Sequence, residues 1–518
     1  MRLRFMNAKN RSYALVLAGM IIIHICLLTT LRIFPMTDLP FHLAVATIHK
    51  HYGEVSNHFA EYYSVDLFPK PNCLHPLFCG LRIFPGVEFG NKVYYGIYLV
   101  LLPVSVLLII RKIRGNPWIS LLSLLLLYNL SFRWGFAGHT MAIPLVLLTL
   151  YFHLRTLSDP RPIFRVLVAV FLVGLYFVHS EASLFCALAL LGSILFHYRR
   201  SAAILGRELL PLIPLAVIVL WWVGWVSRTE GHVLGGLLTY YKTEFLPTIA
   251  ERGELLYVDH RHLFAGLAGR VIGTLFSLII VGPLVVGLVR HWRSFRESLA
   301  RPELKSVLVF MFITLLCYWL LPPRLPGVVC IYRRLSVFIL AWAVVLLAAV
   351  YSRRLPRLAV LALCGAVLFH VVLWGDYFRD FRADTKSFTR EVLPQDSRDK
   401  TLIGLILDWQ FRGVPIYLHF ADYYVVWDLG ITKSRFTQFK YVNVWPKKPQ
   451  EWPPVATEDG SSASQLMKAY SSSDFILVRA EPGRIPHSYL RNFDFKKQSG
   501  EWSLYEKASE DRPHPPNG

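Results

Sequence analysis

The chain has 518 residues, of which 54% are apolar and only 17% are charged, against about 25% charged residues in a soluble globular chain. Its net charge of +21 would suit a nucleic-acid partner, but residues 376–518 are nearly neutral, with 19 acidic and 20 basic residues. The positive excess therefore lies in the apolar part of the chain, in short loops between uncharged runs, where it encodes membrane topology. We expect membrane lipids, and no nucleic acid, as partners.

Apolar runs in residues 1–375 are long enough to cross a hydrocarbon core roughly 30 Å thick. The first run is long and no small-residue cleavage site follows it, which favours an uncleaved span over a signal peptide. Lipid offers the backbone no hydrogen-bond partners, so each run is expected to be a helix. The eleven predicted spans are residues 12–33, 91–110, 117–132, 137–153, 163–178, 182–197, 209–226, 269–289, 306–321, 332–350 and 357–374.

The loops between these spans alternate in charge. If the N-terminus lies inside, every inside loop is basic, and only four of the 15 acidic residues in this part of the chain fall inside. The positive-inside rule then predicts an inside N-terminus, and an odd number of spans places the C-terminal domain outside. Any carboxylate chemistry is therefore expected at the outer face.

Two predicted external loops, residues 34–90 and 227–268, are long enough to suggest a function. In the first, Pro40 suits the first turn of a helix and apolar residues follow at helical spacing, which predicts an amphipathic helix along the membrane surface. A second short interfacial helix is predicted within Cys73–Ile83. Cys73 and Cys79 could pair in an oxidising compartment, although two cysteines alone do not define a disulfide.

Asp38 and His42 are the residues of this loop best suited to chemistry. Their i,i+4 spacing places both on one face of the predicted helix, just after the first span. A carboxylate there could deprotonate an acceptor hydroxyl. The alternative is that Asp38 only caps the N-terminus of the helix.

The C-terminal domain is predicted to be a small α/β domain of residues 376–507, and residues 508–518 are predicted to be a disordered tail. Thr401–Leu407 and Phe475–Arg479 have the composition of buried strands. Phe493–Lys497 and Trp502–Lys507 flank Gly500 and predict a hairpin.

This layout resembles the GT-C superfamily of integral-membrane glycosyltransferases, and in particular its uncharacterised bacterial members. The matching parts are Asp38 soon after the first span, the Pro-rich segment of residues 68–81, the many spans and the C-terminal domain. There is no WWDYG motif, and Leu39 rather than an acidic residue follows Asp38, so the resemblance names neither subfamily nor acceptor. It implies a bacterial inner-membrane enzyme with its active site on the outer face.

The resemblance also implies an anionic lipid substrate, and several polar residues near the outer face are candidates to contact it. Arg333 and Arg334, with Arg324 before them, could bind a donor phosphate, because the guanidinium fork suits phosphate. The alternative is that they snorkel to the lipid headgroups. Glu251, in a TIxE-like segment, and His179 and Glu181, between two spans, are candidate cavity residues; solvated or structural roles are the alternatives.

The expected function is transfer of a sugar from a polyprenyl-phosphate-linked donor to a lipid, glycan or protein acceptor, with Asp38 as general base. The alternatives are a lipid or polysaccharide transporter or flippase, and a non-catalytic cell-surface assembly protein. A coupled transporter usually carries charges within its spans, and these runs are almost free of acidic residues. No Cys/His metal pattern is present, and the sequence leaves a divalent metal cofactor open.

Overall fold

The computed structural model describes residues 8–66, 70–230, 252, 266–325, 328–352, 355–395, 399–433, 443–448, 470–481 and 490–508. The chain divides into two compact units. The helical unit consists of Met1–Thr30 and Tyr95–Tyr377, and the mixed unit consists of Leu31–Tyr94 and Phe378–Gly518. The first long loop thus folds with the C-terminal segment, a partnership that the sequence did not predict. The predicted tail falls almost wholly outside the described residues.

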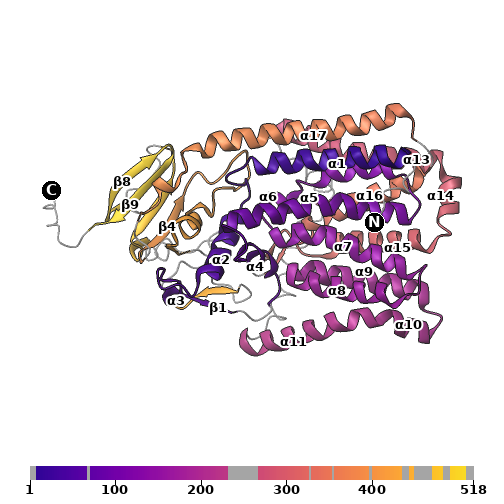
Figure 1. The fold of residues 1–518 in the computed structure, drawn as a ribbon, viewed down its shortest axis with the longest axis horizontal. Helices are drawn as coiled ribbons and strands as arrows, with labels where there is room; N and C mark the ends of the chain where they lie inside the picture. The colour runs from indigo at the N-terminus through magenta and orange to yellow at the C-terminus, as the bar shows by residue number, and fades with distance from the viewer. Residues whose placement is uncertain are drawn as a thin grey trace. The chain divides into compact units, whose positions relative to one another are not determined.

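Apolar helices dominate the helical unit. Among the described residues, nine helical segments are long and apolar enough to cross a membrane, and α8 is a shorter apolar helix. Helix α16 is buried along its whole length, so it forms the centre of this unit, whereas α11 exposes apolar side chains as a lipid-facing helix would. Figure 1 shows α7, α8 and α9 running side by side. The helices are α1 (Ala8–Thr29), α5 (Val87–Lys112), α7 (Ala137–Thr156), α8 (Pro162–Val178), α9 (Ser180–Tyr198), α10 (Ala202–Leu209), α11 (Ile213–Glu230), α13 (Gly266–Arg290), α14 (Trp292–Ser298), α15 (Pro302–Leu320), α16 (Ser336–Val350) and α17 (Arg357–Asp384).

The segment expected to be the third span, residues 117–132, is not one α-helix. It forms the 3₁₀ helix η2 (Pro117–Leu126), followed by the short helix α6 (Leu130–Trp134). The side chain of Asn129 accepts hydrogen bonds from the backbone N–H groups of Ser131 and Phe132, which starts a new helix at that point. A 3₁₀ helix rises about 2.0 Å per residue, so ten residues cover about 20 Å and fewer residues reach across the same depth.

A five-stranded mixed sheet organises the C-terminal part of the mixed unit. Its order is β5-β4-β7-β9-β8, with β4 parallel to β5 and β7, and β9 antiparallel to β7 and β8. The predicted strands and hairpin are confirmed, and Gly500 at the hairpin turn has a φ of +58°, which favours glycine. The strands are β4 (Thr401–Ile406), β5 (Ile431–Thr432), β7 (Phe475–Arg479), β8 (Phe493–Ser499) and β9 (Trp502–Lys507).

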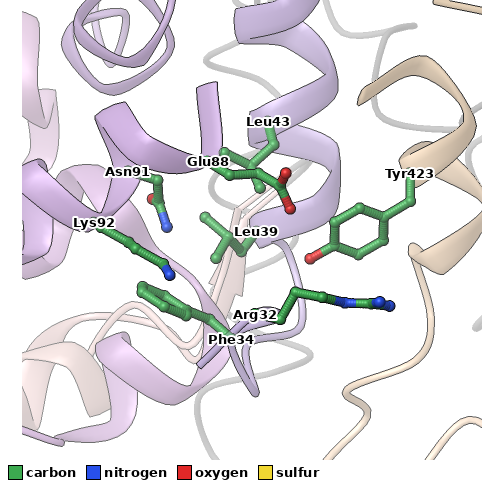
Figure 2. Close-up of a pocket in the computed structure, with 8 residues that line it drawn as sticks. All are labelled: Arg32, Phe34, Leu39, Leu43, Glu88, Asn91, Lys92 and Tyr423. Carbon is green, nitrogen blue, oxygen red and sulfur yellow. The ribbon is translucent and has the colours of Figure 1, made fainter. Parts of the chain in front are cut away.

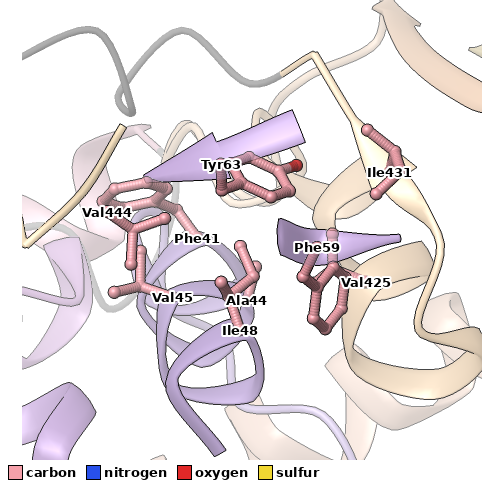
Figure 3. Close-up of a cluster of buried hydrophobic side chains, with 9 residues drawn as sticks. All are labelled: Phe41, Ala44, Val45, Ile48, Phe59, Tyr63, Val425, Ile431 and Val444. Atoms are coloured by element: carbon pink, nitrogen blue, oxygen red, sulfur yellow. The ribbon is translucent and has the colours of Figure 1, made fainter. Parts of the chain in front are cut away.

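The helix predicted in the first loop is α2 (Leu39–His51), and Pro40 stands in its first turn as expected. It is embedded in protein more deeply than a helix lying on a membrane surface would be, because most of its residues are buried. Its apolar face packs with α3 (Phe59–Tyr62), β1 (Tyr63–Val65), α18 (Tyr423–Asp428), β5 and β6 (Val444–Pro446) (Figure 3). Strand β1 pairs antiparallel with β6. Together these contacts fix α2 to the C-terminal segment.

The second helix predicted in the first loop is also present, as α4 (Leu74–Cys79). Leu74 and Leu77 are exposed on it, whereas His75 and Cys79 are buried, as expected for a short interfacial helix. Cys73 and Cys79 are both buried free thiols.

Removing a side chain from the cluster around α2 should destabilise the mixed unit. Phe59 is fully buried there, so we expect Phe59→Ala to cost about 3–5 kcal/mol and to lower the melting temperature of the purified protein in detergent. Phe495→Ala is the matched control, because Phe495 is 56% exposed in the same unit. Equal melting temperatures for the two variants would contradict this description of the cluster.

Candidate functional site

Asp38 occupies the N-cap position of α2, but its side chain makes no capping hydrogen bond. The helix nevertheless begins there, because the backbone N–H of His42 donates to the Asp38 carbonyl oxygen at 3.1 Å. Asp38 is 18% exposed at its side chain, so the carboxylate is accessible yet largely enclosed. The simple capping interpretation therefore does not explain why a carboxylate stands at this position.

His419, from the C-terminal segment, lies beside Asp38. Its Nε2 is 3.8 Å from Asp38 Oδ1, and its Nδ1 is 4.0 Å from Asp422 Oδ2. The imidazole thus stands between two carboxylates and is itself buried, with 7% of its side chain exposed. The hydroxyl of Thr432 donates to Asp422 Oδ1 at 2.8 Å. The sequence did not predict a role for His419, because 381 positions separate it from Asp38 and no motif marks it.

Local chain geometry explains how these residues meet. His419 precedes the 3₁₀ turn η8 (Phe420–Asp422), which leads directly into α18. That helix ends at Leu429 in the left-handed conformation, and Gly430 follows, where a Cβ atom would lie only 2.1 Å from the Tyr424 ring. The tight reversal brings Thr432 of β5 back to Asp422.

Strand β1 of the first loop adds a further tie to this segment. The Tyr63 hydroxyl donates to the Thr432 carbonyl oxygen at 3.0 Å in a buried contact. The first loop and the C-terminal segment are therefore joined next to Asp422 by a hydrogen bond as well as by apolar packing.

His42, predicted as a partner of Asp38, packs against His75 of α4 with their ring centroids 5.6 Å apart. Burial, and then the nearby imidazoles of His75 and His419, lower the pKa of His42 to about 3. Burial lowers the pKa of His75 to about 4, and its Nε2 donates to Asn91 Oδ1 at 2.9 Å. Both histidines are therefore neutral at pH 7, so neither places a positive charge beside Asp38.

A small polar pocket lies in the mixed unit, beside the first turns of α2 (Figure 2). Its cavity volume is about 10 Å³, which is room for about one water molecule. The Arg32 guanidinium and the Glu88 carboxylate, each engaged with Trp427, give it both signs of charge. The pocket is lined by Arg32, Phe34, Leu39, Leu43, Glu88, Asn91, Lys92 and Tyr423.

A second cluster of predicted residues occurs in the helical unit, around Arg334. This arginine belongs to the 3₁₀ turn η5 (Arg333–Leu335), and its Nη1 lies 3.2 Å from Glu181 Oε2 and 3.1 Å from His179 Nε2. Its guanidinium carbon lies 4.0 Å from the centroid of the Phe136 ring. Three of the residues predicted from sequence, Arg334, His179 and Glu181, are thus neighbours.

The hydrogen bonds of this cluster leave part of the guanidinium unused. Neutral imidazole has one acceptor nitrogen, and the Ala182 N–H already donates to His179 Nδ1, so Glu181 is the acceptor that Arg334 can use. Arg334 Nε is buried and has no hydrogen-bond partner in the described part of the chain. Buried donors normally have partners, so this atom is a candidate contact for an anionic ligand.

The remaining predicted residues are less well defined. Arg333 is half-buried beside Arg334. The backbone of Arg324 forms β2 (Arg324–Leu325), which pairs with β3 (Val328–Val329), whereas its side chain lies outside the described residues. Glu251 also lies outside them. His139, which was not among the predicted site residues, packs edge-on against His179, with their ring centroids 4.9 Å apart. Within the described ranges, no group of three or more His, Cys, Asp or Glu residues is placed to hold a metal ion.

Comparison with solved structures shows that the chain shares a known membrane-protein fold. One matching structure is that of ArnT from Cupriavidus metallidurans bound to undecaprenyl phosphate. It shares the fold at a TM-score of 0.59 and 12% sequence identity, over 97% of this chain and 99% of that one. The expected GT-C resemblance is thus confirmed at the level of fold. Sequence comparison with protein-family models and with curated proteins gives no match.

Proposed function

We propose that the protein is a membrane glycosyltransferase that moves a sugar from a polyprenyl-phosphate donor to an acceptor hydroxyl. The observation that carries the proposal is Asp38, a largely enclosed carboxylate that makes no capping hydrogen bond at the start of α2. The fold shared with ArnT, which was crystallised with undecaprenyl phosphate, supports a donor of this lipid class. Because one fold can serve many functions, each proposed role rests on the chemistry of the residues themselves.

In the proposed reaction, Asp38 accepts the proton of the acceptor hydroxyl as its oxygen attacks the anomeric carbon. The bond between that carbon and the donor phosphate oxygen breaks, and polyprenyl phosphate leaves with the electron pair. A positioned general base contributes about 10²–10⁴-fold to such a step. Arg334, with its unused Nε donor, would bind the donor phosphate and stabilise the charge that develops on it. Arg333 and Arg324 stay candidates for the same task.

The direct test is donor cleavage. Purified protein in nanodiscs is given polyprenyl-phosphate sugars and a crude lipid and glycan acceptor fraction, and free polyprenyl phosphate is measured by chromatography. We expect free polyprenyl phosphate to be released only when the acceptor fraction is present. A protein that moved the intact lipid between leaflets of a liposome without cleaving it would instead be a transporter or flippase, and the proposal would be wrong.

We also propose that the mixed unit lies on the outer face of a bacterial inner membrane. Because β1 and β6 are paired, the first loop and the C-terminal segment share one side, so an even number of crossings must separate them. The described residues between them supply ten crossings if η2 and α6 count as one and α10 and α11 as another. With α1 this makes the eleven predicted from sequence. The basic loops then put the shared side outside.

Reporter fusions test this orientation. We expect alkaline phosphatase fused after Tyr377 to be active, because that enzyme folds only outside the cytoplasm, and green fluorescent protein fused there to be dark. The control is a pair of fusions after Arg114, in a basic loop predicted to be inside, where the two signals should be exchanged. The same pattern at both positions, or the reverse pattern at Tyr377, would overturn the orientation.

A further inference from the structure

The contact between Asp38 and His419 suggests a role for the C-terminal segment in the chemistry. We infer that His419 is a positioning residue for Asp38: its imidazole orients the Asp38 carboxylate and is itself held by Asp422 and Thr432. The expected effect of His419 on catalysis rests on the proposed function. The coupling between the His419 and Asp38 side chains can be tested without measuring activity.

The geometry gives each ring nitrogen of His419 one carboxylate. Nε2 faces Asp38 at 3.8 Å and Nδ1 faces Asp422 at 4.0 Å. These separations exceed hydrogen-bond length, so both contacts are electrostatic in this state. Catalytic hydrogen bonds are often long in the absence of substrate and shorten in the complex, so a small movement of Asp38 onto the Nε2–H group would complete the bond.

Asp422 is suited to hold the ring because it is itself held. Thr432 donates to one of its carboxylate oxygens, and the residue is 2% exposed, so its position is set by the protein rather than by water. Donation from both ring nitrogens requires the imidazolium form of His419, which carries an N–H on each nitrogen, and two facing carboxylates favour that form. One connected polar path would then run from the acceptor hydroxyl through Asp38, His419 and Asp422 to Thr432.

The other ionisable groups near His419 do not replace it. His42 faces the same region but is neutral at pH 7, and burial of its ring is the main cause. His75 donates to Asn91 and packs against the His42 ring. Phe41 supplies an apolar wall, with its ring centroid 6.5 Å from that of His419. Among these neighbours, His419 is the one with carboxylates at both nitrogens.

Two amide substitutions separate the two nitrogens of His419. The side-chain nitrogen of glutamine lies where Nε2 of histidine lies, whereas that of asparagine lies where Nδ1 lies. We expect His419→Asn to lower kcat about tenfold to a hundredfold with little change in KM, because a misplaced catalytic group costs of that order. His419→Gln should keep most of the activity. Wild-type kcat in His419→Asn would overturn the inference.

A double-mutant cycle shows whether His419 acts through Asp38. If it does, His419→Asn should cause no further loss in the Asp38→Asn background, since residues that act as a unit are not additive. An equal loss in both backgrounds would mean an independent role and would overturn the inference. His58→Gln is the matched control, because His58 also contacts a carboxylate, that of Glu61 at 2.8 Å, but on the exposed surface.

The final arm needs no substrate. Histidine-selective labelling with ¹³C allows the His419 signal to be assigned by its loss in His419→Gln, and its titration to be followed by NMR in nanodiscs. Asp38→Asn and Asp422→Asn should each move its midpoint to lower pH, because each removes a negative charge near the imidazole. No movement in Asp38→Asn would overturn the coupling. Movement in a protein that cleaves no donor would refute the proposed function while leaving the coupling established.

Discussion

Asp38→Asn is expected to lower sugar transfer by the purified protein at least about a hundredfold, as loss of a general base does. Asparagine has nearly the same size and retains the ability to cap a helix, but it cannot accept a proton at neutral pH. The structure sharpens this expectation, because the Asp38 side chain makes no capping hydrogen bond that the substitution could disturb. The measurement is initial rate at saturating donor, in protein with an unchanged melting temperature.

A second acidic residue of the same loop provides the control. Glu61→Gln removes a carboxylate of the mixed unit that is 69% exposed and pairs only with surface His58 among the contacts of the described residues. Its activity should match that of the parent. If Asp38→Asn turns over donor at the parent rate, Asp38 is not the base and the proposed mechanism is wrong.

Arg334→Lys is expected to weaken binding of a polyprenyl phosphate about tenfold or more. Lysine keeps the positive charge, but it loses the planar fork, the stack on Phe136 and the Nε donor, which are the features that suit arginine to a phosphate. A snorkelling arginine needs only its charge at the interface, so lysine would serve equally well there. Affinity is measured for undecaprenyl phosphate on protein in nanodiscs.

Glu181→Gln should not weaken binding of polyprenyl phosphate, in contrast to Arg334→Lys. The Glu181 carboxylate forms an ion pair with the Arg334 guanidinium, and its negative charge repels an incoming phosphate. Removing the charge should leave binding unchanged or make it tighter. Arg333→Lys is measured in parallel, since adjacent positions of a 3₁₀ turn point about 120° apart and Arg333 would face a different side from Arg334. Parent affinity in both lysine variants would assign the two arginines to membrane anchoring.

Local sequence patterns predicted much of the fold. Runs of apolar residues identified the long helices, alternating or continuous apolar strands identified β4, β7 and the hairpin, and Pro40 marked the start of α2. Each of these elements depends on side-chain spacing within one short segment. Hydropathy could not separate the 3₁₀ helix η2 from an α-helix, because both bury the same leucines and differ in backbone hydrogen bonding.

The sequence predicted candidate site residues only where the signal lay within one short segment. Asp38 stood out by its position after the first span, and His179 and Glu181 by their place between two spans. Contacts between distant segments were invisible: His419 next to Asp38, Glu181 next to Arg334, and β1 paired with β6. These depend on tertiary packing, which no periodicity in a single sequence encodes.

The measurement that tests the central claim most directly is the stoichiometry of the proposed transfer. Purified protein is incubated with a labelled polyprenyl-phosphate sugar and an extracted acceptor fraction, and both products are quantified by mass spectrometry. The account predicts one free polyprenyl phosphate for each sugar found on the acceptor, and at least about a hundredfold less of both products with Asp38→Asn. Intact donor at the end of the incubation with every acceptor fraction, or equal yields from the parent and Asp38→Asn, would contradict it.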